Sequence, residues 1–326
     1  MGAGVESCGG PWQPAALTFP SLAEGGVGAV LGTIFTEADG DDAVRYATGD
    51  AEGAHAAGVR QLEWYERWGR EGKVGAWAGR TPIRGGGVRG AGENGAVSLG
   101  VLMECADPIR DPDELPWWVE RGVVAIGLAW WRGSRYATGN GEPSCTSGIG
   151  LTDLGRELVK RMDAQGVVHD ASHLSDRALD DLFALTDKPV IASHSNCRAL
   201  LGGVNQRHLT DEAILEIGRR GGVIGLNLVK NFIRAGLNRA DPNDRPTVAE
   251  AIDHVEHICA VMGHRRGVGM GSDLDGGISG NDLPAGVSRP RDFEKFAAEL
   301  LRRGWTEEGV DAFAWGNWAR FFGIGL

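Results

Sequence analysis

Short apolar runs and longer amphipathic stretches alternate along the chain. Within the short runs polar and apolar residues do not alternate, which is typical of parallel strands covered on both faces. Seven such runs predict strands at 27–35, 96–103, 123–129, 167–171, 189–193, 222–227 and 267–272.

The stretches between these runs carry apolar residues at helical spacing. They predict helices at 54–72, 113–121, 152–165, 175–184, 210–220, 247–263, 291–303 and 306–322. Ser175 and Thr210 stand at the start of two of them, where a hydroxyl side chain can accept a hydrogen bond from the first helical turn. The resulting β/α rhythm predicts an α/β fold of the (β/α)8 TIM-barrel type, in one domain spanning residues 1–326. Because such a barrel has eight strands, we expect that its first strand is either unrecognised or missing.

The composition of the chain limits the classes of partner that we expect. The chain has 326 residues and a formal net charge of -11, from 33 basic and 44 acidic side chains. A surface this acidic repels phosphate backbones, so we expect no nucleic-acid partner. Neither an apolar run of spanning length nor a signal-peptide pattern is visible, so we expect no membrane partner and a cytoplasmic location.

Neither the cysteines nor the glycine-rich stretch predicts a functional site. The five cysteines are widely spaced without a CxxC pair, which predicts reduced thiols in a cytoplasmic protein. Residues 84–93 are rich in glycine but lack the Gly-Lys-Ser/Thr ending of a phosphate-binding loop, so they predict a surface loop.

Polar side chains that follow the predicted strands are the candidates for chemistry, because the active site of a parallel barrel lies at the carboxyl ends of its strands. Glu104, His173, His194 and Asp273 each follow a different strand, and Trp130 follows another. One histidine in such a place is more often hydrogen-bonded to the backbone. Two imidazoles with two carboxylates, however, are a zinc ligand set typical of hydrolytic sites, and they favour a barrel of the metal-dependent hydrolase kind.

The other histidines are weaker candidates. His55, His254 and His257 fall on predicted helices, where packing or surface roles are expected, and His169 lies near the start of its strand. His208 lies in a loop from which it can line the site.

Several motifs occur in the order found in a known family. They are Gly25–Ala29, Glu104 after its apolar strand, Asp170–Ser175, Pro189–Asn196, Arg207–Asp211, Gly221–Ile224 and Gly271–Gly276. With these motifs the chain resembles the membrane (renal) dipeptidase family of zinc peptidases, above all its bacterial members without a membrane anchor, from about residue 20 to the C-terminus.

The resemblance implies roles for the candidate residues. Glu104 would bridge two zinc ions, and His173 and His194 would complete the second zinc site. Asp273 would bind the first zinc ion or act as general base and then acid toward the attacking hydroxide. Arg207 would hold the carboxylate of a dipeptide, a task that suits a guanidinium. The implied activity is hydrolysis of dipeptides by a metal-bound hydroxide, including those with a C-terminal D-residue, and the implied assembly is a homodimer.

Two neighbours of these residues have smaller expected roles. Asp275 is expected to shape the Asp-Gly turn after its strand. Asn196 is a candidate for a hydrogen bond near the site.

The chain departs from the family pattern at its first metal site. The family supplies a His-x-Asp pair from the first barrel strand, whereas no histidine precedes His55 here. Since the ligands of the second site are present, we expect a shortened N-terminus rather than a lost site.

A second departure lies at Trp130, where many members carry a histidine that polarises the scissile carbonyl. Arg135 or Tyr136 can donate in its place, or both can simply pack against the tryptophans. Two alternatives to dipeptide hydrolysis stay open: a catalytically impaired member that binds one zinc ion or none, and a hydrolase that cleaves another bond, for instance in a lactone or another amide.

Overall fold

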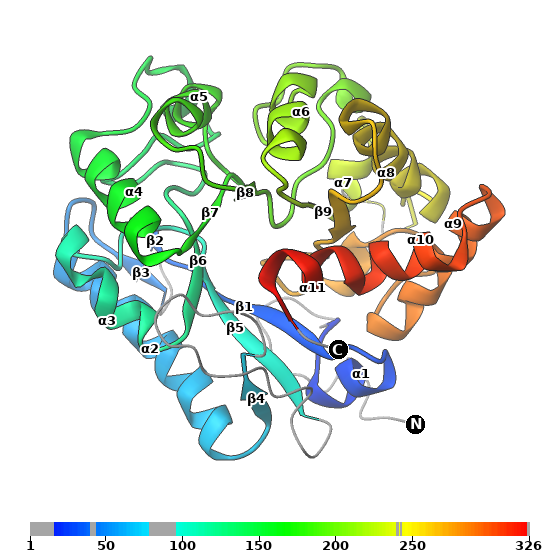
Figure 1. Ribbon diagram of the computed structural model, residues 1–326, viewed down its shortest axis with the longest axis horizontal. Coiled ribbons are helices and arrows are strands. Elements are labelled where there is room, and N and C mark those ends of the chain that lie inside the picture. The colour runs from blue at the N-terminus through cyan, green and yellow to red at the C-terminus, as the bar shows by residue number, and fades with distance from the viewer. Residues whose placement is uncertain (1–15, 40–43, 78–95, 239–240, 242, 325–326) are drawn as a thin grey trace. The chain divides into compact units, whose positions relative to one another are not determined.

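The computed structural model describes residues 16–39, 44–77, 96–238, 241 and 243–324. The glycine-rich loop at 84–93 and Cys8 lie outside these residues. Contacts divide the chain into two compact units, one made of residues 29–191 with the last residues of the chain, and the other of residues 1–28 with 192–322 (Figure 1). We call them the first-half unit and the second-half unit.

A parallel sheet forms the centre of the first-half unit. Its strands run in the order β1-β5-β6-β7-β8, with β4 paired to the beginning of β5. Their bounds are β1 Ala29–Ile34, β4 Val74–Ala76, β5 Val97–Met103, β6 Val123–Gly127, β7 Val168–Asp170 and β8 Val190–Ile191. All of β6 and nearly all of β5 are buried, as the apolar runs predicted.

Helices flank this sheet along one side in Figure 1. They are α2 Ala51–Arg70, α3 Leu115–Val119, α4 Asp153–Gln165 and α5 Asp176–Leu185, and α4 contacts α3, α5 and β7. Two short strands, β2 Glu37–Ala38 and β3 Arg45–Tyr46, pair with each other beyond the end of β1.

The second-half unit has two paired parallel strands, β9 Ile224–Leu226 and β10 Val268–Met270. Ala192, which directly follows β8 in the chain, forms a parallel bridge with Ile224 of β9. The helices are α1 Phe19–Glu24, α6 Asp211–Arg219, α7 Lys230–Ile233, α8 Val248–Met262, α9 Glu294–Arg302, α10 Glu307–Asp311 and α11 Asn317–Phe322. Of these, α8 is the longest, and it packs against α6, α9 and both strands.

The seven predicted strands are all present, as β1, β5, β6, β7, β8, β9 and β10. The short strands β2, β3 and β4 were not predicted. The N-caps are confirmed, because the Ser175 and Thr210 hydroxyls accept hydrogen bonds from Ala178 N and Ala213 N. Among the described residues no strand precedes β1, and no helix is both long and apolar enough to cross a membrane.

One predicted helix is interrupted. The stretch 306–322 contains α10, then a π-helical turn over Ala312–Gly316, then α11. The turn leads directly into Asn317, whose buried amide donates to Arg265 O and Val268 O. A π-turn adds one residue to the helical repeat, a shift that helical spacing in the sequence does not reveal.

Candidate active site

In the first-half unit, Glu104 and His173 meet. Glu104 directly follows β5 and His173 lies in the turn after β7, so both stand at the carboxyl edge of the parallel sheet. His173 Nε2 lies 3.1 Å from Glu104 Oε1. Each of the two side chains offers an atom that can bind a metal ion. Two ligand atoms on one tetrahedral zinc ion, with bonds of about 2.0–2.1 Å, stand roughly 3.3 Å apart. The separation of this pair therefore fits a shared metal ion.

His173 is held in an unusual backbone conformation. Its φ is 68°, in the left-handed region that non-glycine residues rarely occupy. Strain of this kind persists only where surrounding contacts enforce it, and it gathers at functional sites. Asp273, a second predicted site residue, has the same feature with a φ of 58°.

Asn140 contacts His173 from the loop after β6. Its Oδ1 lies 3.2 Å from His173 Nδ1, and its backbone N–H donates to His173 O. Asn140 was not predicted as a site residue, because it lies well beyond the end of its strand, in a loop without periodic pattern.

Trp130, Arg135 and Tyr136 lie in the same unit. The Trp130 ring lies 5.9 Å from the His173 ring. The Arg135 guanidinium donates to Asp107 O, Ile109 O and Arg110 O, and the buried Tyr136 hydroxyl donates to Ile109 O. Both side chains are thus occupied with the 107–110 loop, which favours the packing alternative over donation to a substrate.

Two groups near the Asp107 carboxylate, the Cys105 thiol and the Tyr46 hydroxyl, are neutral. Burial raises the pKa of the Cys105 thiol, with the Asp107 carboxylate adding to the effect. Burial likewise raises the pKa of Tyr46, whose hydroxyl donates to Asp107. Cys105 is therefore a protonated core residue at neutral pH rather than a nucleophile or a metal ligand.

In the second-half unit, His194 and Asp273 are connected through Asn227. The Asn227 amide nitrogen donates to Asp273 Oδ2 at 2.9 Å and to His194 O at 3.4 Å. Its Oδ1 accepts from Val229 N, so the whole amide group is fixed. Asn227 directly follows β9 and could have been found by the same rule as Glu104, since it comes right after a buried strand.

Two glycines let the backbone before His194 approach β9 and β10. A Cβ atom at Gly225 or at Gly271 would lie 2.0 Å from Ser193 O, far inside van der Waals contact. Glycine at these positions therefore fixes where the turn carrying His194 can run.

Arg207 is buried in this unit. Its two terminal nitrogens donate to Ser195 Oγ and His194 O, and the guanidinium lies over the Phe232 ring at 5.1 Å. Asn196 bonds to the backbone of Asn227 and of Phe232, which ties the turn after β8 to the segment after β9.

Asp275 has a structural contact. Its carboxylate oxygens accept hydrogen bonds from Ala16 N and Leu17 N, each at 2.8 Å, and its φ is 57°. The residue thus both forms its turn and attaches the segment before α1 to it.

The remaining histidines have structural partners. His254 is buried between Cys197 N and Ile233 O, and burial lowers its pKa, so it is neutral. His169 contacts Asp163, His257 contacts Asp211, and His55 contacts Pro108 O. His208 is buried, with its ring edge-on to Phe232 at 5.0 Å.

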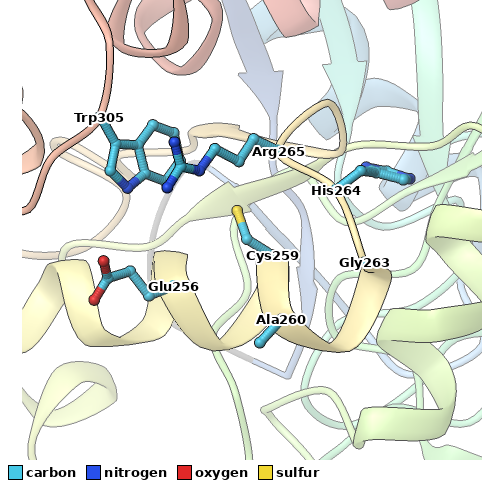
Figure 2. A pocket seen from close by; sticks show the side chains of 7 residues that line it. All are labelled: Glu256, Cys259, Ala260, Gly263, His264, Arg265 and Trp305. Carbon is cyan, nitrogen blue, oxygen red and sulfur yellow. The ribbon is translucent and has the colours of Figure 1, made fainter.

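A separate pocket of about 320 Å³ opens on the second-half unit, and Figure 2 shows Arg265 lying over the Trp305 ring there. None of the predicted site residues lines it. Its lining residues are Glu256, Cys259, Ala260, Gly263, His264, Arg265 and Trp305.

Comparison with known proteins extends these observations to the whole chain. Residues 13–324 match the family model described as membrane dipeptidase (peptidase family M19). An uncharacterised protein of Klebsiella pneumoniae, from the pqqA 5′ region, is 32% identical over 61% of this chain and 71% of its own length.

Two solved structures are similar in fold. The metallopeptidase named dipeptidase AC is 25% identical, with a TM-score of 0.78, over 95% of this chain and 89% of its own. A metallopeptidase of Rhodobacter sphaeroides, solved with a phosphinate mimic of the dipeptide L-Ala-D-Ala, is 25% identical, with a TM-score of 0.77, over 96% and 91% of the two chains. These likenesses, the parallel sheet and the carboxylate–imidazole pair agree with the TIM-barrel metallohydrolase class predicted from the sequence. The chain belongs to the membrane dipeptidase family, peptidase family M19, and is a hydrolase of the peptidase class.

Proposed function

We propose that the chain hydrolyses dipeptides with a zinc ion held by Glu104, His173 and His194. The observation that carries the proposal is the 3.1 Å approach of His173 Nε2 to Glu104 Oε1 at the carboxyl edge of a parallel sheet. A carboxylate and an imidazole at this separation are a donor set that suits zinc.

The strand register supports His194 as the third ligand. Asp170 of β7 pairs with Ile191 of β8, and His173 and His194 stand at the same distance along the chain beyond these two partners. Neighbouring parallel strands in register deliver such residues to the same edge of a sheet. When bound, zinc would polarise the scissile carbonyl and lower the pKa of a coordinated water molecule.

The chain's own residues would carry the other steps. Asp273, oriented by the Asn227 amide, would take the proton of the attacking water and give it to the leaving amine. Arg207 would bind the C-terminal carboxylate of the dipeptide: one bond from each terminal nitrogen, to Ser195 and to His194 O, holds the guanidinium in place, and each of these nitrogens carries two N–H groups.

The substrate range we propose includes dipeptides with a C-terminal D-residue. Support comes from the Rhodobacter sphaeroides relative, whose structure holds a mimic of L-Ala-D-Ala. We also propose a cytoplasmic, homodimeric enzyme.

A panel of L-Xaa-L-Xaa and L-Xaa-D-Xaa dipeptides tests the proposal, assayed with added zinc and with chelator. Dipeptide amides serve as matched controls, because they keep the scissile bond and lack the carboxylate for Arg207. Chelator-sensitive hydrolysis of free dipeptides, and weak hydrolysis of the amides, is the expected result. Equal rates on both would remove the role of Arg207.

The second candidate is a family member that binds one zinc ion or none and does not turn over dipeptides. Trp130 favours it, because an indole beside His173 can offer only a neutral N–H and cannot become a cation, as the histidine that many members carry there can. Folded protein that binds about one zinc ion and leaves every dipeptide intact would support this candidate.

A further inference from the structure

The loop carrying Asn140 is fastened to the turn carrying His173. Asn140 N donates to His173 O at 2.9 Å, and Ser175 N donates to Thr138 O at 3.1 Å. Between them, Gly139 forms an antiparallel bridge with Leu174. The segments 138–140 and 173–175 therefore pair as a short antiparallel ribbon inside the first-half unit.

Gly139 allows this ribbon to form. A Cβ atom at Gly139 would lie 1.7 Å from Trp130 O, so no larger residue fits while the loop keeps its course. The position of Asn140 is thus set by backbone packing and not by its own side chain alone.

The Asn140 side chain contacts only the Nδ1 nitrogen of His173 in this hydrogen bond. An amide oxygen only accepts hydrogen bonds, so the 3.2 Å contact from Oδ1 requires the proton on His173 Nδ1. The lone pair of a neutral ring is then on Nε2, the nitrogen that lies 3.1 Å from Glu104. This is the tautomer that a ring needs in order to bind a metal ion through Nε2.

We propose that Asn140 is a positioning residue for the metal site: it fixes the tautomer and ring direction of His173. The proposal rests on the proposed metal site, but not on the substrate. Partners of this kind typically contribute a factor of about 10–100 to metal affinity.

The Nδ2 group of Asn140 helps to distinguish a role at the metal site from a role in stabilising the fold. Asn140 is buried, and its Nδ2 has no hydrogen-bond partner in the part of the chain that the structure describes. A buried donor without a partner destabilises a fold, typically by about 1–3 kcal/mol. Asn140→Leu removes this unpaired donor but also removes the acceptor of His173 Nδ1–H, so the two effects offset and the stability of the metal-free protein should change little.

The test compares three variants of the full chain. Zinc affinity is measured by competition with a chromophoric chelator, and thermal unfolding is measured in excess chelator. Asn140→Leu should weaken zinc binding about 10–100-fold while the unfolding temperature of the metal-free protein changes little. Asn140→Asp keeps the accepting oxygen and should retain wild-type affinity.

Thr138→Val is the matched control. Thr138 belongs to the same ribbon, where its hydroxyl bonds to Ser175 and to Ile149 O without touching His173. Its loss should lower the unfolding temperature and leave zinc affinity unchanged.

Wild-type affinity in Asn140→Leu would overturn the proposal, as would an equal loss of affinity in Asn140→Asp and Asn140→Leu. If Asn140→Leu does not fold, the side chain is structural and the proposal fails on that ground. Wild-type protein that binds no zinc would remove the metal site and this role together. Zinc binding without dipeptide hydrolysis would leave the role of Asn140 intact and remove only the proposed reaction.

Discussion

The two units hold their predicted site residues in different ways. In the first-half unit an imidazole and a carboxylate touch directly, and an amide sits behind the imidazole. In the second-half unit the Asn227 amide nitrogen donates both to His194 O and to Asp273, and the Arg207 guanidinium donates to the same His194 O. Direct contact of two ligand types suits metal binding, whereas the Asn227 amide and the Arg207 guanidinium suit proton handling and substrate binding beside His194, the proposed third ligand.

The largest effect is expected from a substitution that breaks the contact between Glu104 and His173. His173→Asn removes Nε2 while keeping a residue that tolerates positive φ. Because a catalytic metal supplies several kcal/mol to the transition state, kcat/KM should fall about 1,000-fold or more, together with zinc content. His257→Gln is the control, since its contact is a half-exposed pair with Asp211 and should matter little. Retained zinc and activity in His173→Asn would exclude the metal role.

Arg207→Lys tests the substrate side of the comparison. The change keeps the positive charge but loses the fork that binds a carboxylate at two points. KM for free dipeptides should rise about 10–100-fold, the value of one or two charged hydrogen bonds. The rates on dipeptide amides should hardly change. A rise in KM for both substrate classes would instead indicate that Arg207 mainly supports the turn that carries His194.

Gly271→Ala tests how the turn before His194 is fixed. The new Cβ would overlap Ser193 O, and overpacking of this kind destabilises by about 1–3 kcal/mol. Thermal unfolding should therefore shift down by several degrees. At Gly28 a Cβ would meet nothing within 4 Å, so Gly28→Ala should unfold like the wild type. Equal stability of the two variants would contradict the close approach.

Asn227→Asp sharpens the contrast between direct and bridged contact. The variant keeps the acceptor for Val229 N but replaces the donor to Asp273 by a repelling carboxylate. We expect kcat to fall about tenfold, in keeping with the loss of one charged hydrogen bond, at little change in KM. A change confined to KM would place Asn227 with substrate binding instead.

Arg265→Ala gives the smallest effect. Stacking of this exposed guanidinium on Trp305 stabilises by roughly 0.5–1 kcal/mol. Unfolding should shift slightly and kcat/KM should stay unchanged, because no predicted site residue lines that pocket. A large loss of activity would show that the pocket takes part in the reaction.

The sequence predicted the strands better than the loops. Parallel strands are buried on both faces, so continuous apolar runs in the sequence predict them. The candidate residues after β5, β7 and β8 follow from the positions at which those runs end. Glu104 and His173 were predicted in this way, and they meet.

Asn140, which contacts His173, could not be found by the same rule. Asn140 reaches His173 through a loop whose course depends on Gly139 passing Trp130 O, a contact between segments without pattern. Asn227 does satisfy the rule, since it directly follows β9, but an amide is neither a usual metal ligand nor a general base, so its residue type did not mark it as a candidate. The contacts of Arg135 and Tyr136 with the 107–110 loop are equally invisible in sequence, since they join side chains to backbone carbonyls.

The most direct test of the central claim is a zinc titration of the metal-free protein, followed by dipeptide hydrolysis at each point. The account predicts tight zinc binding that is abolished in His173→Asn, and hydrolysis that rises with occupancy and disappears with chelator. Hydrolysis at full rate in metal-free protein, or zinc binding that survives His173→Asn unchanged, would contradict it.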